Sequence, residues 1–217
     1  MTGFQLIVDV ILHLDTYLGE IISLYGLITY ALLFLIIFIE TGLVFTPFLP
    51  GDSLLFAAGV FSALGSLNLA FLLVLLVAAA FLGDTTNYWV GNFMGKKILA
   101  NSRLPVKKQH LEQTNNFFRK YGRKTIVLAR FVPVVRTFAP FLAGVGRMNY
   151  GSFVSFNIIG GILWVTICLL AGYFFGSIPL IRDNFSIVTI SIVVISILPI
   201  LIQFIRNRRK KIIIQKY

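Results

Sequence analysis

Residues 45–52, FTPFLPGD, interrupt an apolar tract with two prolines, a glycine and a carboxylate. A related stretch, FAPFLAG, occupies residues 138–144, and five of its seven residues match those of FTPFLPG. Proline ends or kinks a helix, and broken backbone at membrane depth must be buried in protein or line a wet cavity. Each stretch therefore predicts a break within a membrane-embedded helical hairpin. The predicted break residues are Pro47, Pro50, Gly51, Pro133, Pro140 and Gly144.

The composition is that of an integral membrane protein. Hydrophobic side chains make up 58% of the 217 residues and charged side chains 12%, and the mean hydropathy is +0.90. These values lie outside the usual range of a soluble domain. Several apolar tracts reach the roughly 20 residues that a spanning helix needs. We therefore predict an all-α, multi-span helical bundle.

Positive charge is confined to the second half of the chain. Residues 1–95 contain no lysine or arginine, although the whole chain has 19 of them. Most lie in a central loop at residues 96–124 and a tail at residues 206–217. Cytoplasmic loops are enriched in lysine and arginine, so both regions are predicted to be cytoplasmic, including the C-terminus. These clusters flank apolar tracts and lack a nucleic-acid reading module, so no nucleic-acid partner is expected.

The predicted topology follows from placing both basic regions on one side. Two spans, near residues 153–175 and 185–205, already supply the even number of crossings that this requires. The tract at 125–147 is then a re-entrant hairpin, and the break at 47–51 lies in a second hairpin that opens to the opposite face. We expect one membrane domain, residues 1–217, built as an inverted repeat. Its predicted parts are repeat 1 (about 21–93, with spans near 21–39 and 67–93), a basic loop with an amphipathic helix (96–124), repeat 2 (about 125–205) and the tail (206–217).

Four charged residues lie at the two predicted breaks. Glu40 and Asp52 flank the first break, and Arg130 and Arg136 flank Pro133 in the second. Ionisable groups within apolar tracts are costly, so they are usually paired and functional. One interpretation is a structural set of ion pairs between the hairpins. The other is a transport site in which both arginines bind a phosphate and either carboxyl group exchanges a proton.

The other polar residues give weaker evidence of a functional site than the four charged residues do. The spacing of Asp84, Asn87 and Tyr88 places them on neighbouring helical faces, where helix packing is the favoured interpretation. The two histidines, His13 and His110, are far apart in the sequence, and the chain has one cysteine. No metal site, cofactor or enzymatic activity is expected from this set. A membrane phosphatase would want a histidine near the arginines, and neither break contains one.

Three stretches carry a resemblance to a known family. They are FIETGLVFTPFLPGDSLLFAAG, GDTTNYWVGNFMGKK and ARFVPVVRTFAPFLAGVGRMNYGSFVSFNIIGGILWV. Together they resemble the DedA family of bacterial inner-membrane proteins, and the resemblance covers residues from about 17 to 199. It implies a VTT-type fold with two oppositely oriented re-entrant hairpins. The functional acids of that family fall on Glu40 and Asp52, and its functional arginines fall on Arg130 and Arg136.

The resemblance also implies a function. Members move lipids between leaflets of the inner membrane, and dependence on the proton-motive force is a theme of the family. The implied cargo is undecaprenyl phosphate or a phospholipid such as phosphatidylethanolamine, and two arginines fit the first better. The expected partners are thus a lipid substrate and the membrane, with oligomerisation left open. A scaffold that stabilises other membrane complexes without transport is the alternative.

Overall fold

The computed structural model describes residues 14–43, 51–100, 122–176 and 178, and this part of the chain is helical with no strand. An all-helical chain confirms the predicted class. The predicted span at 185–205, the basic tail and most of the basic loop lie outside the described residues. The helices are α2 (Leu14–Tyr25), α3 (Ile28–Gly42), α4 (Gly51–Ala63), α5 (Leu69–Ala100), η1 (Gly122–Lys124), α7 (Thr125–Ala129), α8 (Pro133–Val145) and α9 (Tyr150–Gly176).

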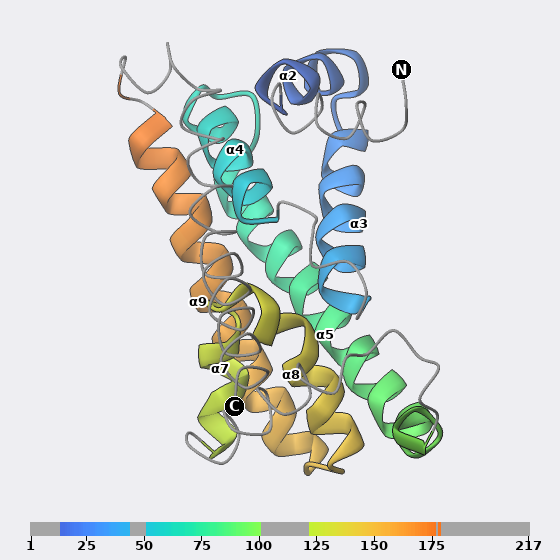
Figure 1. Ribbon diagram of the computed structural model, residues 1–217. Coiled ribbons are helices and arrows are strands. Elements are labelled where there is room, and N and C mark those ends of the chain that lie inside the picture. The colour runs from blue at the N-terminus through green and yellow to red at the C-terminus, as the bar shows by residue number, and fades with distance from the viewer. Residues whose placement is uncertain (1–13, 44–50, 101–121, 177, 179–217) are drawn as a thin grey trace, which may run out of the picture.

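Two long helices, α5 and α9, run the length of the molecule (Figure 1). Their apolar stretches cover 25 residues, Leu69–Phe93, and 27 residues, Tyr150–Gly176. At a rise of about 1.5 Å per residue, each exceeds the ~30 Å hydrocarbon core of a bilayer. The helices run antiparallel, because Phe153 stacks on Tyr88 while Asn157 contacts the carbonyl of Phe81. They form the frame on which the shorter helices pack.

The predicted span at 21–39 is interrupted, which corrects that prediction. Helix α2 ends at Tyr25 and α3 begins at Ile28, with Gly26 between them at a φ of +50°. Glycine adopts this left-handed conformation without the steric cost of a Cβ. The Gly26 N–H donates to the carbonyl of Ile22 at 3.0 Å, which is a common way to end a helix. As a result α2 lies across the end of the bundle (Figure 1).

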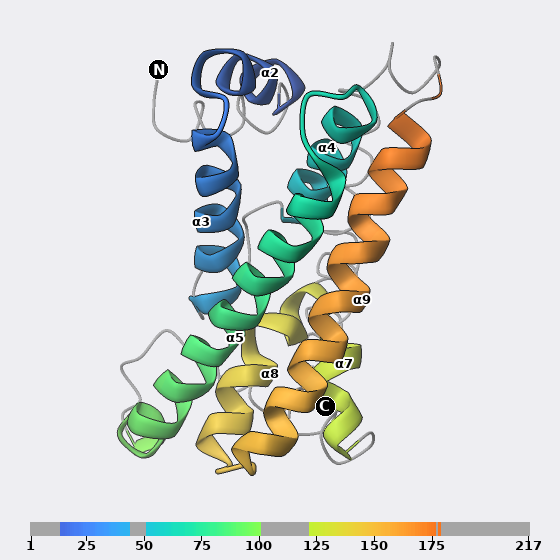
Figure 2. The same cartoon turned by 180° about the vertical axis from the view of Figure 1, so that it is seen from behind.

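The first predicted break separates α3 from α4. Gly51 begins α4, whereas Pro47 and Pro50 lie outside the described residues. The two helices run in opposite directions: the Gly51 N–H meets the side chain of Glu40 near the end of α3, and Asn68, beyond the end of α4, meets Tyr30 near the start of α3. Helix α4 packs mainly against α9, alongside its C-terminal half (Figure 2).

The second break lies earlier in the chain than predicted. Helix α7 ends at Ala129 and α8 begins at Pro133, so the α7–α8 turn consists of residues 130–132. Val132 is extended, with φ −121° and ψ 104°, because the residue before a proline is disfavoured in the helical region. Pro140 and Gly144 were predicted as break residues, but both lie inside α8. Of the residues predicted for the second break, only Pro133 lies at it. Pro133 is the first residue of α8, a position where a helix tolerates proline.

The short helices contact the long ones through equivalent glycines. A Cβ on Gly59 of α4 would collide with the backbone of Leu169 in α9, and a Cβ on Gly172 would collide with the carbonyl of Phe56. Small residues at helix interfaces allow the backbones to approach closely.

The contact between α8 and α5 repeats this pattern. A Cβ on Gly144 of α8 would collide with the backbone of Tyr88 in α5, and a Cβ on Gly91 would collide with the carbonyl of Phe141. Phe56 and Gly59 therefore take the places of Phe141 and Gly144, at a spacing of 85 residues (141 minus 56). The sequence match of 45–51 with 138–144, spaced by 93 residues (138 minus 45), is out of register with this packing.

Candidate functional site

Arg136 lies in the first turns of α8 and joins three helices. Its Nη1 donates to Asp52 Oδ1 at 3.0 Å, and its Nη2 donates to Glu40 Oε1 in a very short contact. Asp52 belongs to the first turn of α4, and Glu40 lies near the end of α3. The structure thus brings together three of the four charged residues that the sequence singled out. We call Glu40, Asp52 and Arg136 the Arg136 cluster.

The carboxylate of Glu40 lies at the N-terminus of α4. Gly51 donates its backbone N–H to Glu40 Oε1 at 3.3 Å, and the residue is only 1% exposed. The N-terminal end of a helix carries partial positive charge and exposed N–H groups, which favour an anion there. A Cβ on Gly51 would collide with the Glu40 carboxylate. The glycine is therefore needed for this close approach, independently of any break that it creates.

Trp164 of α9 connects the cluster to the long helices. Its Nε1 donates to Asp52 Oδ1 at 2.8 Å, so this oxygen accepts from both Trp164 and Arg136. The indole ring lies 5.2 Å from Cζ of Arg136 and 5.9 Å from Cζ of Arg130. Guanidinium groups at such distances are attracted to the ring face. Trp164 was not among the predicted site residues, and a tryptophan in an apolar tract gave no signal in the sequence.

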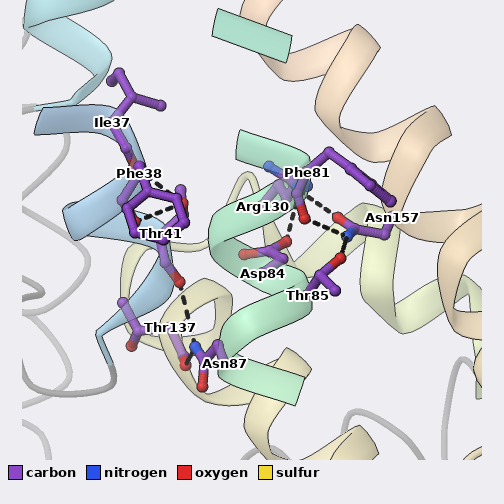
Figure 3. A network of polar contacts seen from close by, with 10 residues as sticks. All are labelled: Ile37, Phe38, Thr41, Phe81, Asp84, Thr85, Asn87, Arg130, Thr137 and Asn157. Atoms are coloured by element: carbon purple, nitrogen blue, oxygen red, sulfur yellow. Dashed lines mark hydrogen bonds and ion pairs between the residues drawn. The ribbon is translucent and has the colours of Figure 1, made fainter. Parts of the chain in front are cut away.

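Arg130 does not join the Arg136 cluster, although all four charges were predicted to lie at one interface. Its Nη2 donates to Asp84 Oδ2 at 2.5 Å and to Asn157 Oδ1 at 2.5 Å (Figure 3). Asp84 was interpreted as a helix-packing residue, and it is indeed buried between helices, but the sequence did not indicate its ion pair with Arg130. An ionisable residue inside a spanning tract was the signal that could have identified it.

Asparagines tie the broken helices to α5. Asn87 donates through Nδ2 to the carbonyl of Thr137 at 2.9 Å and to that of Thr41 at 3.3 Å (Figure 3). Thr41 lies in the last turn of α3, whose final carbonyls have no partner within the helix. The same asparagine therefore attaches the end of α3 and the body of α8 to α5.

A small cavity lies among these side chains. Its lining residues are Glu40, Thr41, Asp84, Arg130, Arg136, Thr137 and Trp164. The space holds about one water molecule, which is too little for a phosphate group. Two carboxyl groups (Glu40, Asp84) and both guanidinium groups line the cavity, and Asp52 binds Arg136 beside it. Together these five groups carry an excess of one negative charge when all are ionised. Within the described residues, no three His, Cys, Asp or Glu side chains form a group that could hold a metal.

Fold and site together define a class: a helical membrane protein with a buried cluster of opposite charges where its short helices begin. The VTT domain matches residues 49–174, and Protein DedA of Escherichia coli (strain K12) is 50% identical over 206 residues, covering 94% of both chains. The chain therefore belongs to the DedA family.

More distant relatives agree with this membership. Inner membrane protein YqjA of Escherichia coli (strain K12) is 37% identical over 72% of this chain and 71% of its own. Uncharacterized membrane protein Rv0364 of Mycobacterium tuberculosis (strain ATCC 25618 / H37Rv) is 43% identical over 82% of this chain and 79% of its own. These names fit a membrane location. No solved structure matches the chain.

Proposed function

We propose that this protein moves an anionic, phosphate-bearing lipid between the leaflets of the bacterial inner membrane without chemically converting it. The observation that carries the proposal is the Arg136 cluster, in which one guanidinium bridges two carboxylates where α4 and α8 begin. Guanidinium groups bind phosphates through paired, charge-assisted hydrogen bonds. Undecaprenyl phosphate is the cargo that the family resemblance and this chemistry favour.

The two turn-backs of the chain are proposed to be re-entrant hairpins related by an inverted repeat. In α3, α4 and α5 the middle helix runs opposite to the outer two, and α7, α8 and α9 repeat this order with all directions reversed (Figures 1 and 2). The equivalent glycine contacts of α4 with α9 and of α8 with α5 support the same relation. Helices α4 and α8 have 13 residues each, which is too short to cross a bilayer.

The transport cycle is proposed to exchange partners of Arg136. In the closed arrangement its guanidinium binds Glu40 and Asp52, and the cavity is too small for a headgroup. When a lipid phosphate replaces these carboxylates, the site already carries excess negative charge, so an added anion disfavours ionised carboxyl groups. Glu40 or Asp52 would then take up a proton. Release on the other side reverses both steps, which couples lipid movement to the proton-motive force.

The N-terminal ends of α4 and α8 would assist the binding of phosphate. Both helices begin beside the cluster, so the partial positive charge of each N-terminal end lies near it. The Gly51 N–H of α4 already donates to Glu40, and Pro133, the first residue of α8, has no N–H. Such ends favour anions. The basic loop at 96–124 and the tail at 206–217 are proposed to face the cytoplasm, which gives the site a defined orientation.

Reconstitution tests the proposal. Purified protein in proteoliposomes would be supplied with labelled undecaprenyl phosphate or labelled phosphatidylethanolamine, each with and without a pH gradient. We expect transfer of undecaprenyl phosphate between leaflets that accelerates when the gradient is applied. Faster transfer of phosphatidylethanolamine would instead assign a phospholipid flippase or scramblase. Rates equal to those of protein-free liposomes with both lipids would refute transport.

A scaffold without transport is the second candidate. It is favoured by the saturation of the charged groups: Arg136 already has two carboxylate partners, and Arg130 has two partners of its own. A scaffold needs only the ion pairs, so exchanging Glu40 and Arg136 for each other in one variant would preserve its function. A transporter would lose activity, because the arginine would no longer lie at the start of α8.

A further inference from the structure

Arg130 is held by both long helices at once. Its Nη2 contacts Asp84 of α5 and Asn157 of α9 at 2.5 Å each, and the residue is 5% exposed. We call these three residues the Arg130 triad. Asn157 is fixed in turn, because its Nδ2 donates to the carbonyl of Phe81 at 3.2 Å and to Thr85 Oγ1 at 3.5 Å on α5 (Figure 3). The α7–α8 turn is thereby attached to the frame of the molecule.

The other edge of the Arg130 side chain is packed against α9. A Cβ added to Gly160 would lie 3.0 Å from Cδ and 3.1 Å from Nε of Arg130. Nε has no hydrogen-bond partner within the described part of the chain, yet Gly160 leaves no room for a ligand on that edge. The orientation of this guanidinium is thus set by close packing as well as by its ion pair.

Arg136 is placed differently. Both of its partners flank the segment between α3 and α4, and neither belongs to a long helix. The Asp52 side chain is 25% exposed, whereas Asp84 and Arg130 side chains are 6% and 4% exposed. Separating a fully buried pair leaves uncompensated charges and is strongly unfavourable, while a partly exposed pair separates at lower cost. Arg136 has one buried partner, Glu40, and one partly exposed partner, Asp52, and its pair with Asp52 is the one suited to exchange.

We propose that Arg130, held by Asp84 and Asn157, is a positioning residue that fixes the α7–α8 turn, and that Arg136 is the arginine that receives the lipid phosphate. The inference rests on the proposed function and divides the roles of two arginines that the sequence treated alike. It also assigns roles to Asp84 and Asn157. Arg130 then controls the rate at which the site opens and closes, and Arg136 controls the affinity of the site for the lipid phosphate.

Binding of a headgroup separates the two roles. The chain has two tryptophans, so Trp89→Phe leaves Trp164, beside both arginines, as the reporter of binding. In this background geranyl phosphate would be titrated into the detergent-solubilised protein and its Arg130→Gln and Arg136→Gln variants. We expect the Kd to rise at least about tenfold for Arg136→Gln and to change less than about threefold for Arg130→Gln.

The outcomes of this titration are distinguishable. A rise of about tenfold in the Kd of Arg130→Gln would overturn the inference and leave the proposed function standing, with both arginines as ligands. An unchanged Kd for Arg136→Gln would overturn the proposed function itself. Since Arg130→Gln leaves Asp84 unpaired, the double variant Asp84→Asn/Arg130→Gln, which removes both charges, provides the same comparison if the single variant does not fold.

Transport rates test the positioning role. Maximal rates would be normalised to folded protein, so a residue that only stabilised the fold would leave them unchanged. We expect the normalised maximal rate of Arg130→Gln and of Asp84→Asn each to fall at least about tenfold. The rate of the double variant should exceed that of either single variant, because the double variant leaves no buried charge unpaired. Normalised rates of both single variants equal to wild type would overturn the role.

A matched pair of glycines provides a milder test. Gly160→Ala pushes against Arg130, whereas the nearest atom to a Cβ on the adjacent Gly161 lies 3.7 Å away, an ordinary contact. Gly160→Ala should lower the normalised maximal rate without changing the Kd for geranyl phosphate, and Gly161→Ala should change neither. Equal rates for the two variants would contradict the claim that the orientation of Arg130 matters.

Discussion

At the scale of single residues, the site is built from charges whose partners come from other helices. Glu40 contacts both Arg136 and the first N–H of α4, and Trp164 contacts Asp52 from α9. The contacts of Glu40 with Arg136 and of Trp164 with Asp52 join elements that are far apart in the sequence. A substitution at one residue therefore acts on two helices, and its effect reports on the contact between them.

Glu40→Gln tests the proton step. Glutamine keeps the shape of glutamate and still offers an oxygen to Arg136 and to the Gly51 N–H, but it cannot exchange a proton. The other ionisable groups that line the cavity are Asp84, Arg130 and Arg136, and Asp52 binds Arg136 beside it. We expect the variant to lose the acceleration by a pH gradient in proteoliposomes. A gradient response like that of wild type would assign the proton to another carboxyl group.

Gly51→Ala tests the approach of Glu40 to α4. The added Cβ would collide with the Glu40 carboxylate, so either α4 or the side chain must move. We expect a loss of about 1–3 kcal/mol in the free energy of unfolding in detergent, as for other overpacked sites, together with slower transport. Gly161→Ala, which has room, serves as the control. A stability equal to that of the control would show that Glu40 does not lie where the structure places it.

At the scale of the elements, the short helices depend on close contact with the long ones. Helices α4 and α8 begin at the charged site and pack against α9 and α5 through glycines at equivalent places. The proposed relation between the halves is supported by these glycine contacts and not by the sequence match. The match of FTPFLPG with FAPFLAG is out of register with the glycine contacts. A match this short arises readily by chance in an apolar chain that is rich in phenylalanine and leucine.

Gly59→Ala and Gly144→Ala test this equivalence. In each variant the new Cβ meets backbone atoms of the partner helix, which cannot rotate away as a side chain can. We expect both to destabilise the protein by similar amounts, about 1–3 kcal/mol, and to lower transport. Unfolding in detergent, followed by the loss of tryptophan signal, measures the first effect. A large loss in one variant and none in the other would argue against equivalent roles for α4 and α8.

At the scale of the whole molecule, the sequence predicted the helical membrane class, the family and the meeting of Glu40 and Asp52 with Arg136. Hydropathy and rare buried charges carry that information directly. The Arg130 triad could not be predicted, because it depends on packing between distant segments. The turn at Gly26 and the break before Pro133 follow from local backbone preferences, which hydropathy does not report. The ion pair of Asp84 was missed because its partner Arg130 lies 46 residues away in the chain.

The most direct test of the central claim compares two arginines in proteoliposomes. Arg136→Gln removes the guanidinium of the cluster, and Arg147→Gln removes an exposed guanidinium beyond the end of α8. We predict that Arg136→Gln lowers the rate of undecaprenyl phosphate transfer, normalised to folded protein, by about 100-fold or more, while Arg147→Gln stays within about twofold of wild type. Transfer by folded Arg136→Gln at the wild-type rate would contradict it.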